Sequence, residues 1–352
     1  MLLRYLYLRN FRNHKDISVD FGPRVNNIYG PNAQGKTNLL EAIYFLLTGR
    51  SFRKHSIFNL IRHGADSFYI EAHFIKRNVE QKLSIVTNGK GKRVTYNNNL
   101  YSSLTNLLGI LQGVILTPED GNLINGSPAI RRRYLDIQIA QADPLYVHHL
   151  NRYLRAMKCR NVLLRKKSLK SIESWEYEMA RSAKYIVASR FRAIEDLVKK
   201  SVEILRNLSL SGDRMSLCYK TSASMKDLEG DLLLEHYLKQ YQSWRSREIG
   251  LGYTLVGPHR DDMSIAICDK EAFLYASEGQ KFCCSMALRL AEWERLRDLV
   301  EDLPIMAIDD IGNSLDNFRK KSIEKYLSYL GQVFITSTEK LFVENSLFIS
   351  IN

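Results

Sequence analysis

The hydrophobic and polar positions follow different patterns in different parts of the chain. In the first hundred residues apolar and polar side chains alternate as in β-strands, at 17–21, 25–29, 68–74, 83–86 and 94–96. One stretch among them, from Lys36 to Leu47, repeats its apolar residues about every 3.6 positions. This stretch predicts a helix that packs on a sheet.

From Leu145 to about Leu208 the apolar period is helical throughout. The polar stretch 164–171 would connect two antiparallel helices of ~25 to 30 residues, each about 40 Å long. After Gly252 strands return at 263–267, 305–308 and 333–335, with one helix from Gln280 to Val300. The order predicts an α/β unit formed from both chain ends and interrupted by a helical arm.

Length and charge extend this picture. A chain of 352 residues is long enough for two domains, and its 51 Lys and Arg against 38 Asp and Glu give a net charge of +13. That balance favours a phosphate-bearing partner, either nucleic acid or an anionic membrane face. Residues 131–206 hold eighteen Lys and Arg against eight Asp and Glu, so most of the excess lies in the helical arm. Long exposed helices also carry lysines simply to stay soluble, which leaves both interpretations open.

The sequence carries no pattern of secretion or membrane insertion. Arg4 and Arg9 interrupt the apolar N-terminus, and no run of ~18 apolar residues follows, so we expect a cytoplasmic protein. The five cysteines form no C-x-x-C pair and their number is odd. We therefore expect neither a zinc site nor disulfides, and interpret the cysteines as reduced core residues.

Residues 30–37 read GPNAQGKT and match the phosphate-loop pattern G-x-x-x-x-G-K-[ST] between a strand and a helix. Such a loop wraps its backbone N–H groups around phosphate at a helix N-terminus. We expect Lys36 to bridge the β- and γ-phosphates of ATP and Thr37 to bind Mg²⁺. A chance glycine turn before a helix is the alternative, and both flanks argue against it. The expected nucleotide contacts are Gly30, Pro31, Asn32, Ala33, Gln34, Gly35, Lys36 and Thr37.

Two acids follow the buried strand at 305–308. Ligand sites of α/β sheets form at the carboxyl ends of strands. We expect Asp309 to bind Mg²⁺, mostly through water, and Asp310 to polarise the attacking water, so that Lys36, Asp309 and Asp310 are the catalytic candidates. On its own the run would more simply be a strand ending in a solvated turn; the phosphate loop reverses that preference.

A second anion receptor is predicted where the helix near Gln280 begins. Ser277 and Gly279 stand at its N-terminus, where the helix dipole favours negative charge. One γ-phosphate is not easily held by two helix ends from the same face of one sheet, so we expect Ser277, Gly279 and Gln280 to contact the nucleotide of a second copy in an ATP-dependent twofold dimer. The alternative is that Ser277 is a simple N-cap.

Together these motifs resemble the RecF family within the ABC/SMC superfamily of ATPases. The resemblance runs nearly end to end, and the segment 118–136 is its most specific part. The stretches that carry it are 10–13 (NFRN), 30–44 (GPNAQGKTNLLEAIY), 49–53 (GRSFR), 118–120 (PED), 126–128 (GSP), 131–136 (RRRYLD), 257–262 (GPHRDD) and the Ser277 segment.

The resemblance implies an α/β, ABC/SMC-type P-loop ATPase head formed from 1–130 plus 250–352, with an inserted helical arm or lobe at 131–249. It also implies that Arg12 contacts the nucleotide, that ATP and Mg²⁺ are the cofactors, and that ATP drives homodimerisation with slow, DNA-stimulated hydrolysis. Proteins of the family bind duplex DNA near single-strand gaps and work with RecR and RecO to help load the RecA recombinase.

Two positions depart from the family pattern. Asn313-Ser314 stands where Ser-Glu is usual, and Glu278 stands where Gln is commoner. Because Glu278 would place a negative charge near a phosphate, hydrolysis or dimer affinity would be reduced. The altered Asn313-Ser314 loop keeps open a DNA-binding scaffold that ATP switches with negligible hydrolysis. The ATP-driven subunit of a membrane transporter is a third reading, which leaves the basic arm without a role.

Phosphate contacts to DNA are expected from two basic clusters, with little readout of bases. Arg131 and Arg132 could instead be structural, joined to carboxylates such as Asp136. His259 and Arg260 could border the ligand or fix a turn. The DNA-binding candidates are Arg131, Arg132, Arg133, Arg165, Lys166 and Lys167.

Overall fold

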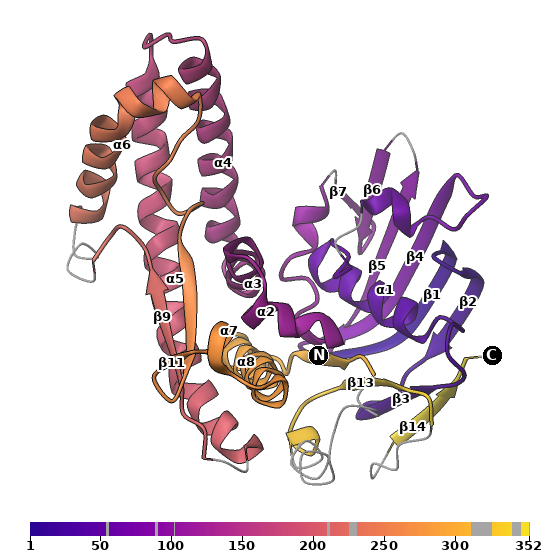
Figure 1. Ribbon diagram of the computed structural model, residues 1–352. Coiled ribbons are helices and arrows are strands. Elements are labelled where there is room, and N and C mark those ends of the chain that lie inside the picture. Colours follow the sequence, from indigo (N-terminus) through magenta and orange to yellow (C-terminus); the bar gives the residue numbers. More distant parts are fainter. Residues whose placement is uncertain are drawn as a thin grey trace. The chain divides into compact units, whose positions relative to one another are not determined.

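The protein is described by a computed structural model that covers residues 1–53, 56–88, 91–101, 103–209, 212–224, 231–310, 326–339 and 346–351. The chain forms two compact units (Figure 1). Unit 1 comprises 1–120, 203–213 and 282–352, and unit 2 comprises 121–202 and 214–281. Among the described residues, every helix is too short or too polar to cross a lipid bilayer.

Unit 1 contains two sheets. The antiparallel sheet has, in spatial order, β2 (His14–Asp20), β1 (Leu2–Phe11), β4 (Ser67–Lys76), β5 (Val79–Asn88), β6 (Gly91–Tyr96) and β7 (Asn99–Tyr101). The parallel sheet has the order β14 (Ser346–Ser350), β3 (Val25–Tyr29), β13 (Val333–Ser337), β12 (Ile305–Ile308) and β8 (Gly113–Leu116). The central strands β3, β13 and β12 come from distant parts of the chain, as an α/β unit made of both ends requires.

The core of unit 1 forms around α1 (Lys36–Thr48). Its side chains are buried on nearly all sides, because the apolar residues of both sheets and those of α1 belong to one cluster. The 3₁₀ turn η2 (Leu104–Leu107) contacts α1; the turns η1 (Ile57–Leu60) and η3 (Pro118–Gly121) follow α1 and β8 along the chain. Most of α8 (Glu278–Leu299) also belongs to unit 1 and buries Trp293 completely.

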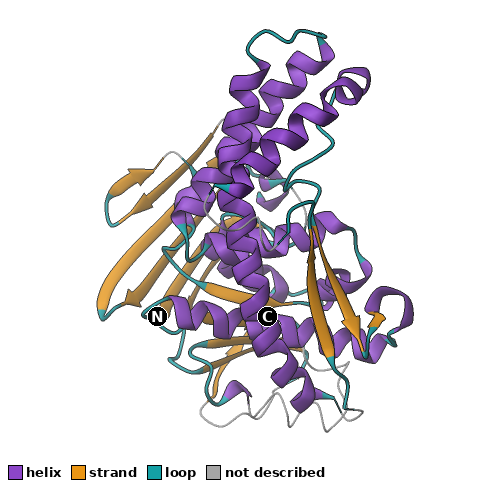
Figure 2. Cartoon of the chain, turned by 90° about the vertical axis from the view of Figure 1, so that its left-hand side faces the viewer, coloured by secondary structure: helices purple, strands orange, loops and turns teal. Residues whose placement is uncertain are grey.

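Unit 2 is built from helices and one small sheet. Three long helices lie side by side (Figure 2): α4 (Pro144–Arg165), α5 (Ile172–Leu208) and α6 (Leu232–Leu251). Arg160 of α4 is fully buried and binds Glu176 of α5 at 2.9 Å and Glu248 of α6 at 2.6 Å, so one guanidinium joins all three helices. The remaining elements are α2 (Asn122–Asn125), α3 (Pro128–Ala140), the antiparallel sheet of β9 (Met215–Lys220), β10 (Asp262–Ile267) and β11 (Lys270–Glu271), and α7 (Ala272–Tyr275).

The structure confirms the expected helix at 36–47, the strands at 25–29, 305–308 and 333–335, and the connection at 164–171 between two long helices. The helices have 22 and 37 residues, so the second is longer than expected. The division into units also differs from the expected one, because β10 pairs with β9 and α3 packs on β10. Residues 121–130 and 250–281 therefore lie in unit 2.

Two of the cysteines were placed wrongly by the sequence. Cys283 and Cys284 are buried as expected of small core residues, but Cys218 and Cys268 are exposed. Cys218 lies on β9 and Cys268 lies in the turn between β10 and β11, where its φ is 48°. All five cysteines are free thiols in the structure.

Candidate functional site

The loop 30–35 leaves the end of β3 and leads directly into α1. Gly30 has a φ of 150° and Gly35 a φ of 103°. A Cβ atom at Gly30 would lie 2.5 Å from the carbonyl oxygen of Ile351, and one at Gly35 would lie 2.6 Å from Oδ1 of Asn13. Both positions therefore require glycine, and residues 31–34 between them are exposed.

Lys36 is the first residue of α1 and is largely buried. Its ammonium group donates hydrogen bonds to the carbonyl oxygens of Gly30 at 2.7 Å and Pro31 at 2.8 Å. The positive charge thus lies within the loop, at the N-terminal end of a helix whose dipole adds to it. This combination attracts an anion.

Asp309 directly follows β12 and lies at the edge of the parallel sheet where β3 also ends. Its Oδ1 atom accepts hydrogen bonds from Thr37 Oγ1 at 3.0 Å and from Thr336 Oγ1 at 2.6 Å. Burial raises the pKa of the Asp309 carboxyl, while these two hydroxyl donors lower it. The sequence placed Thr37 and Asp309 together correctly, but gave no role to Thr336, which comes from the end of β13.

Asp310 differs from its neighbour in exposure and backbone conformation. Its side chain is exposed and its φ is 51°, in the left-handed region. Its N–H donates to Thr336 Oγ1 at 2.9 Å, so the Thr336 hydroxyl holds both acids. Asp310 borders the cavity described next.

A polar cavity of about 320 Å³ opens between the loop and the ends of β12 and β13. Its wall contains two cations, Lys36 and Arg53, and otherwise small or polar side chains. The lining residues are Asn32, Ala33, Gly35, Lys36, Thr37, Asn38, Arg53, Asp310, Thr336, Ser337 and Thr338. Such a wall suits the phosphate groups of a nucleotide better than an apolar ligand.

Arg53 is a member of the cavity wall that sequence reasoning missed. Its guanidinium donates to Asn38 Oδ1 at 2.7 Å and lies 3.6 Å from the Glu41 carboxylate. The stretch GRSFR drew attention through its resemblance to a family motif, but neither its spacing nor its composition indicates which arginine reaches the loop. The position of Arg53 at the loop depends on its ion pair with Glu41, which follows Lys36 on α1.

Arg12 is not among the residues that line the cavity, and its expected contact with the nucleotide stays a prediction. It binds Glu41 with two hydrogen bonds of 2.8 and 2.7 Å and also donates to the carbonyl oxygen of Asn59. Glu41 is completely buried and accepts a third hydrogen bond from Ser51. A buried carboxylate needs such partners, and Arg12 supplies the strongest of them.

The N-terminus of α8 carries a reciprocal cap. Ser277 Oγ accepts the Gln280 N–H at 3.2 Å, and Gln280 Oε1 accepts the Ser277 N–H at 2.9 Å, which is the capping box of a Ser-x-x-Gln sequence. Ser277 and Glu278 are exposed, and Glu278 pairs with Lys281 at 3.0 Å. None of these residues lines the polar cavity of unit 1. The departure at Asn313-Ser314 lies outside the described residues.

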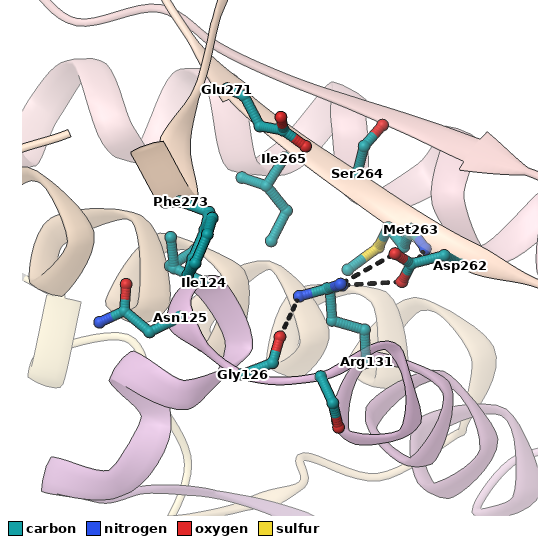
Figure 3. A pocket seen from close by; sticks show the side chains of 11 residues that line it. Ile124, Asn125, Gly126, Arg131, Asp262, Met263, Ser264, Ile265, Glu271 and Phe273 are labelled. Carbon is teal, nitrogen blue, oxygen red and sulfur yellow. Dashed lines mark hydrogen bonds and ion pairs between the residues drawn. The ribbon is translucent and has the colours of Figure 1, made fainter. Parts of the chain in front are cut away.

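Arg131 and Arg132 have structural partners. Arg131 forms a bidentate ion pair with Asp262 at 2.8 Å and donates to the carbonyl oxygen of Gly126 (Figure 3). Arg132 donates to the carbonyl oxygen of Asp261 at 2.7 Å. These contacts support the alternative that the two arginines are structural: Arg131 holds α3 on β10 through Asp262, rather than the suggested Asp136, and Arg132 does so through the backbone of Asp261. Arg133 is half-buried.

The second basic cluster is different. Arg165, Lys166 and Lys167 are exposed at the C-terminal end of α4, where positive charge is favourable to the helix dipole. Arg165 donates to the carbonyl oxygen of Asn161 in the preceding turn. A role for this cluster in binding DNA stays a prediction.

The stretch 257–262 forms a partly buried turn that leads into β10. His259 hydrogen-bonds Tyr153 at 2.7 Å and the Thr254 carbonyl oxygen at 3.2 Å, and burial lowers its pKa to about 4. Gly257 has a φ of 125°, and a Cβ atom there would lie 2.3 Å from the Tyr153 hydroxyl. Of the two roles considered for His259, the structure supports fixing the turn.

The family model of the RecF/RecN/SMC N-terminal domain matches residues 2–350. The DNA replication and repair protein RecF of Protochlamydia amoebophila (strain UWE25) is 45% identical, over 98% of this chain and 96% of its own. RecF of Chlamydia caviae is 36% identical over 96% and 92%. A solved structure described as the recombination mediator protein RecF-ATP in the RecFOR pathway has a TM-score of 0.92 at 32% identity, covering 99% of this chain and 95% of its own.

An Smc head bound to the C-terminal winged-helix domain of ScpA shares the fold, with a TM-score of 0.57 at 18% identity over 97% of this chain and 90% of its own. The expected α/β fold, an ABC/SMC-type ATPase head, is therefore confirmed. Both the family model and the relatives cover this chain almost completely. The chain belongs to the RecF family of DNA replication and repair proteins.

Proposed function

We propose that this protein is an ATP-dependent recombination mediator that dimerises on ATP, binds duplex DNA near single-strand gaps and supports RecA loading with RecR- and RecO-type partners. It acts in the cytoplasm and hydrolyses ATP slowly, with stimulation by DNA. The observation that carries the proposal is the pair of hydrogen bonds that join Asp309 to Thr37 of the phosphate loop and to Thr336. They bring the residues needed for a nucleotide and its metal to one cavity.

In this proposal the loop 30–37 surrounds the phosphates and Lys36 exchanges the carbonyl oxygens of Gly30 and Pro31 for phosphate oxygens. Arg53 adds a second positive charge from the cavity wall. Thr37 Oγ1 and Asp309 Oδ1, only 3.0 Å apart, are the hard oxygen donors that Mg²⁺ prefers. When bound, Mg²⁺ neutralises phosphate charge during transfer.

Asp310 orients the attacking water and accepts its proton. Its exposed carboxylate at the cavity wall and its backbone, fixed by the Thr336 hydroxyl, support this role. Ser277, Gly279 and Gln280 contact the nucleotide of the second copy, and their place at the N-terminus of α8, where Ser277 is exposed, supports it. The capping box holds this helix end in shape before the partner arrives.

The DNA contact is made by the exposed cations at the end of α4, Arg165, Lys166 and Lys167, and by Arg133 on α3. Their contacts are to phosphate, so affinity falls steeply with salt and depends little on base sequence. Arg131 and Arg132 are left out of this contact because Asp262 and the backbone of Asp261 hold their guanidinium groups.

The proposal is tested by Lys36→Met, followed by analytical ultracentrifugation with and without ATP. We expect the variant to stay monomeric with ATP while the parent dimerises, and ATP to raise the stability of the parent but not that of the variant, since a ligand stabilises only the state that binds it. Lys166→Met is the matched control, because it removes an exposed cation of unit 2 and should dimerise normally. Dimers of Lys36→Met at the parental ATP concentration would refute the clamp.

A further inference from the structure

Three consecutive large apolar residues are exposed on α7. Phe273 is 52% exposed, Leu274 61% and Tyr275 69%. The helix has only four residues and is fixed by Ala272, which is buried on the other side. Single exposed apolar residues are ordinary, whereas three in succession form a patch of the size that is often functional. We call Phe273, Leu274 and Tyr275 the α7 patch.

A cavity beside the patch explains the exposure of Phe273. It measures about 280 Å³ and lies between α2, β10 and α7. Figure 3 shows Phe273 and Ile124 close together on one side and the Arg131–Asp262 ion pair on the other. This volume is below that of most small-molecule sites but holds one inserted side chain. The cavity therefore favours a protein surface over a free cofactor.

The place of the patch in the chain indicates which protein covers it. Tyr275 is two residues before Ser277, the N-cap of α8, so the two Cα atoms are at most about 7 Å apart. Under the proposed function Ser277 faces the nucleotide of a second copy. A side chain so near that contact lies in the same interface, and an exposed apolar patch there is covered when the second copy binds.

We propose that the α7 patch is the apolar part of the surface through which two copies of this chain associate, and that the partner copy inserts a side chain into the adjoining cavity. The inference rests on the proposed ATP-dependent dimer and adds to it. Taking about 200 Å² for each fully exposed residue, the patch offers roughly 350 Å² per copy. A stable interface needs about 800 Å² per partner, so the patch alone does not hold a dimer.

Because the patch is too small to hold a dimer by itself, it makes dimerisation depend on a second contact. The nucleotide bridge and the apolar contact each supply part of the interface, and association requires both. Association through the patch differs from a phosphate contact in its response to salt, because apolar contacts are not screened. The contribution of the patch to dimer affinity should therefore be the same at low and high salt.

The test replaces Leu274 and Tyr275 by Ser and measures the dimer dissociation constant by sedimentation with a slowly hydrolysed ATP analogue. We expect it to rise about a hundredfold, as for residues at the centre of an interface. Nucleotide affinity of the monomer should be unchanged, because neither residue lines the polar cavity. The matched control is Leu145→Ser with Tyr177→Ser, two residues of unit 2 that are 59% and 52% exposed.

The outcomes separate the two proposals. If the parent chain stays monomeric with the analogue, the proposed clamp fails and the inference with it. If the parent dimerises and the Leu274, Tyr275 variant dimerises equally well, or the control loses as much affinity, only the inference about the patch is overturned. A variant that keeps its melting profile and analogue affinity but loses dimers, while Tyr275→Phe retains them, supports it.

Discussion

Replacement of Thr336 by Val tests whether the hydroxyl at the end of β13 is what positions the two acids. The residue is buried, and the two side chains have nearly the same shape, so the change removes only a hydroxyl. That hydroxyl donates to Asp309 at 2.6 Å and accepts the Asp310 N–H at 2.9 Å. The variant therefore leaves Asp309 with Thr37 as its remaining hydroxyl donor among those described here.

The expected loss of stability depends on the charge of Asp309, the group to which the Thr336 hydroxyl donates. A hydrogen bond to a charged group contributes about 1.5–3 kcal/mol to stability, against about 1 kcal/mol for a neutral pair. Asp310 is exposed, so water replaces the lost acceptor of its N–H at little cost. We expect the free energy of unfolding to fall by about 2 kcal/mol, and nucleotide affinity with Mg²⁺ to fall because Asp309 is no longer held in place.

Thr48→Val is the matched control within the same unit. Thr48 is equally buried and its hydroxyl also has two roles, donating to the Tyr44 carbonyl oxygen at 2.9 Å and accepting the Arg50 N–H at 3.2 Å. Both partners are neutral, so we expect a loss of about 1 kcal/mol and unchanged nucleotide affinity.

Urea denaturation of the full chain measures the free energy of unfolding, and titration with ATP and Mg²⁺ measures nucleotide affinity. Thr336→Ser should restore both. Equal destabilisation by the two valine variants, with nucleotide binding intact in both, would contradict the role given to Thr336.

Two further predictions concern hydrolysis and DNA. Asp310→Asn should abolish DNA-stimulated phosphate release while ATP-dependent dimerisation persists, because the residue lies in the cavity wall and is not part of the loop; equal, near-zero release by the parent would instead indicate a switch that does not hydrolyse ATP. Replacing Lys166 and Lys167 by Gln should lower the slope of log affinity for duplex DNA against log salt by about two, since each lysine neutralises one phosphate. Lys270→Gln, an exposed cation on β11, is the control, and an equal loss of slope there would remove the assignment of the α4 cluster.

Local patterns predicted the parts of the site that are contiguous in sequence. The loop 30–37 is recognisable because glycine is needed at two positions where a Cβ would collide with neighbouring atoms. The strand that carries Asp309 is recognisable because it is buried on both faces and therefore uniformly apolar. The pairing of Thr37 with Asp309 followed, since parallel strands bring their carboxyl ends to one edge.

Contacts that depend on the tertiary fold could not be predicted from local sequence patterns. Thr336 reaches Asp309 only because β13 lies between β3 and β12, an order of strands that no local pattern encodes. Arg53 and Arg12 both bind Glu41. In the sequence Glu41 is an ordinary polar position of a helix, and only the fold shows that it is completely buried. The helix α6 was also missed, because its buried positions include Tyr237, Tyr241 and Glu248 rather than a plain apolar stripe.

The basic residues show why a count of charges predicts a partner but not a contact. Arg131 and Arg132 are successive on a helix, so their side chains point about 100° apart and cannot form one phosphate-binding row. One turns to the Asp262 carboxylate and the next to the backbone of Asp261, where a planar guanidinium forms several hydrogen bonds at once. The cations at the end of α4 stand beside a short connection that is exposed on most sides. Lys166 and Lys167 are exposed, so their ammonium groups can bind phosphate without leaving a buried position. Burial therefore divides the basic residues into arginines that hold unit 2 together and an exposed cluster at the end of α4, for which DNA binding is proposed.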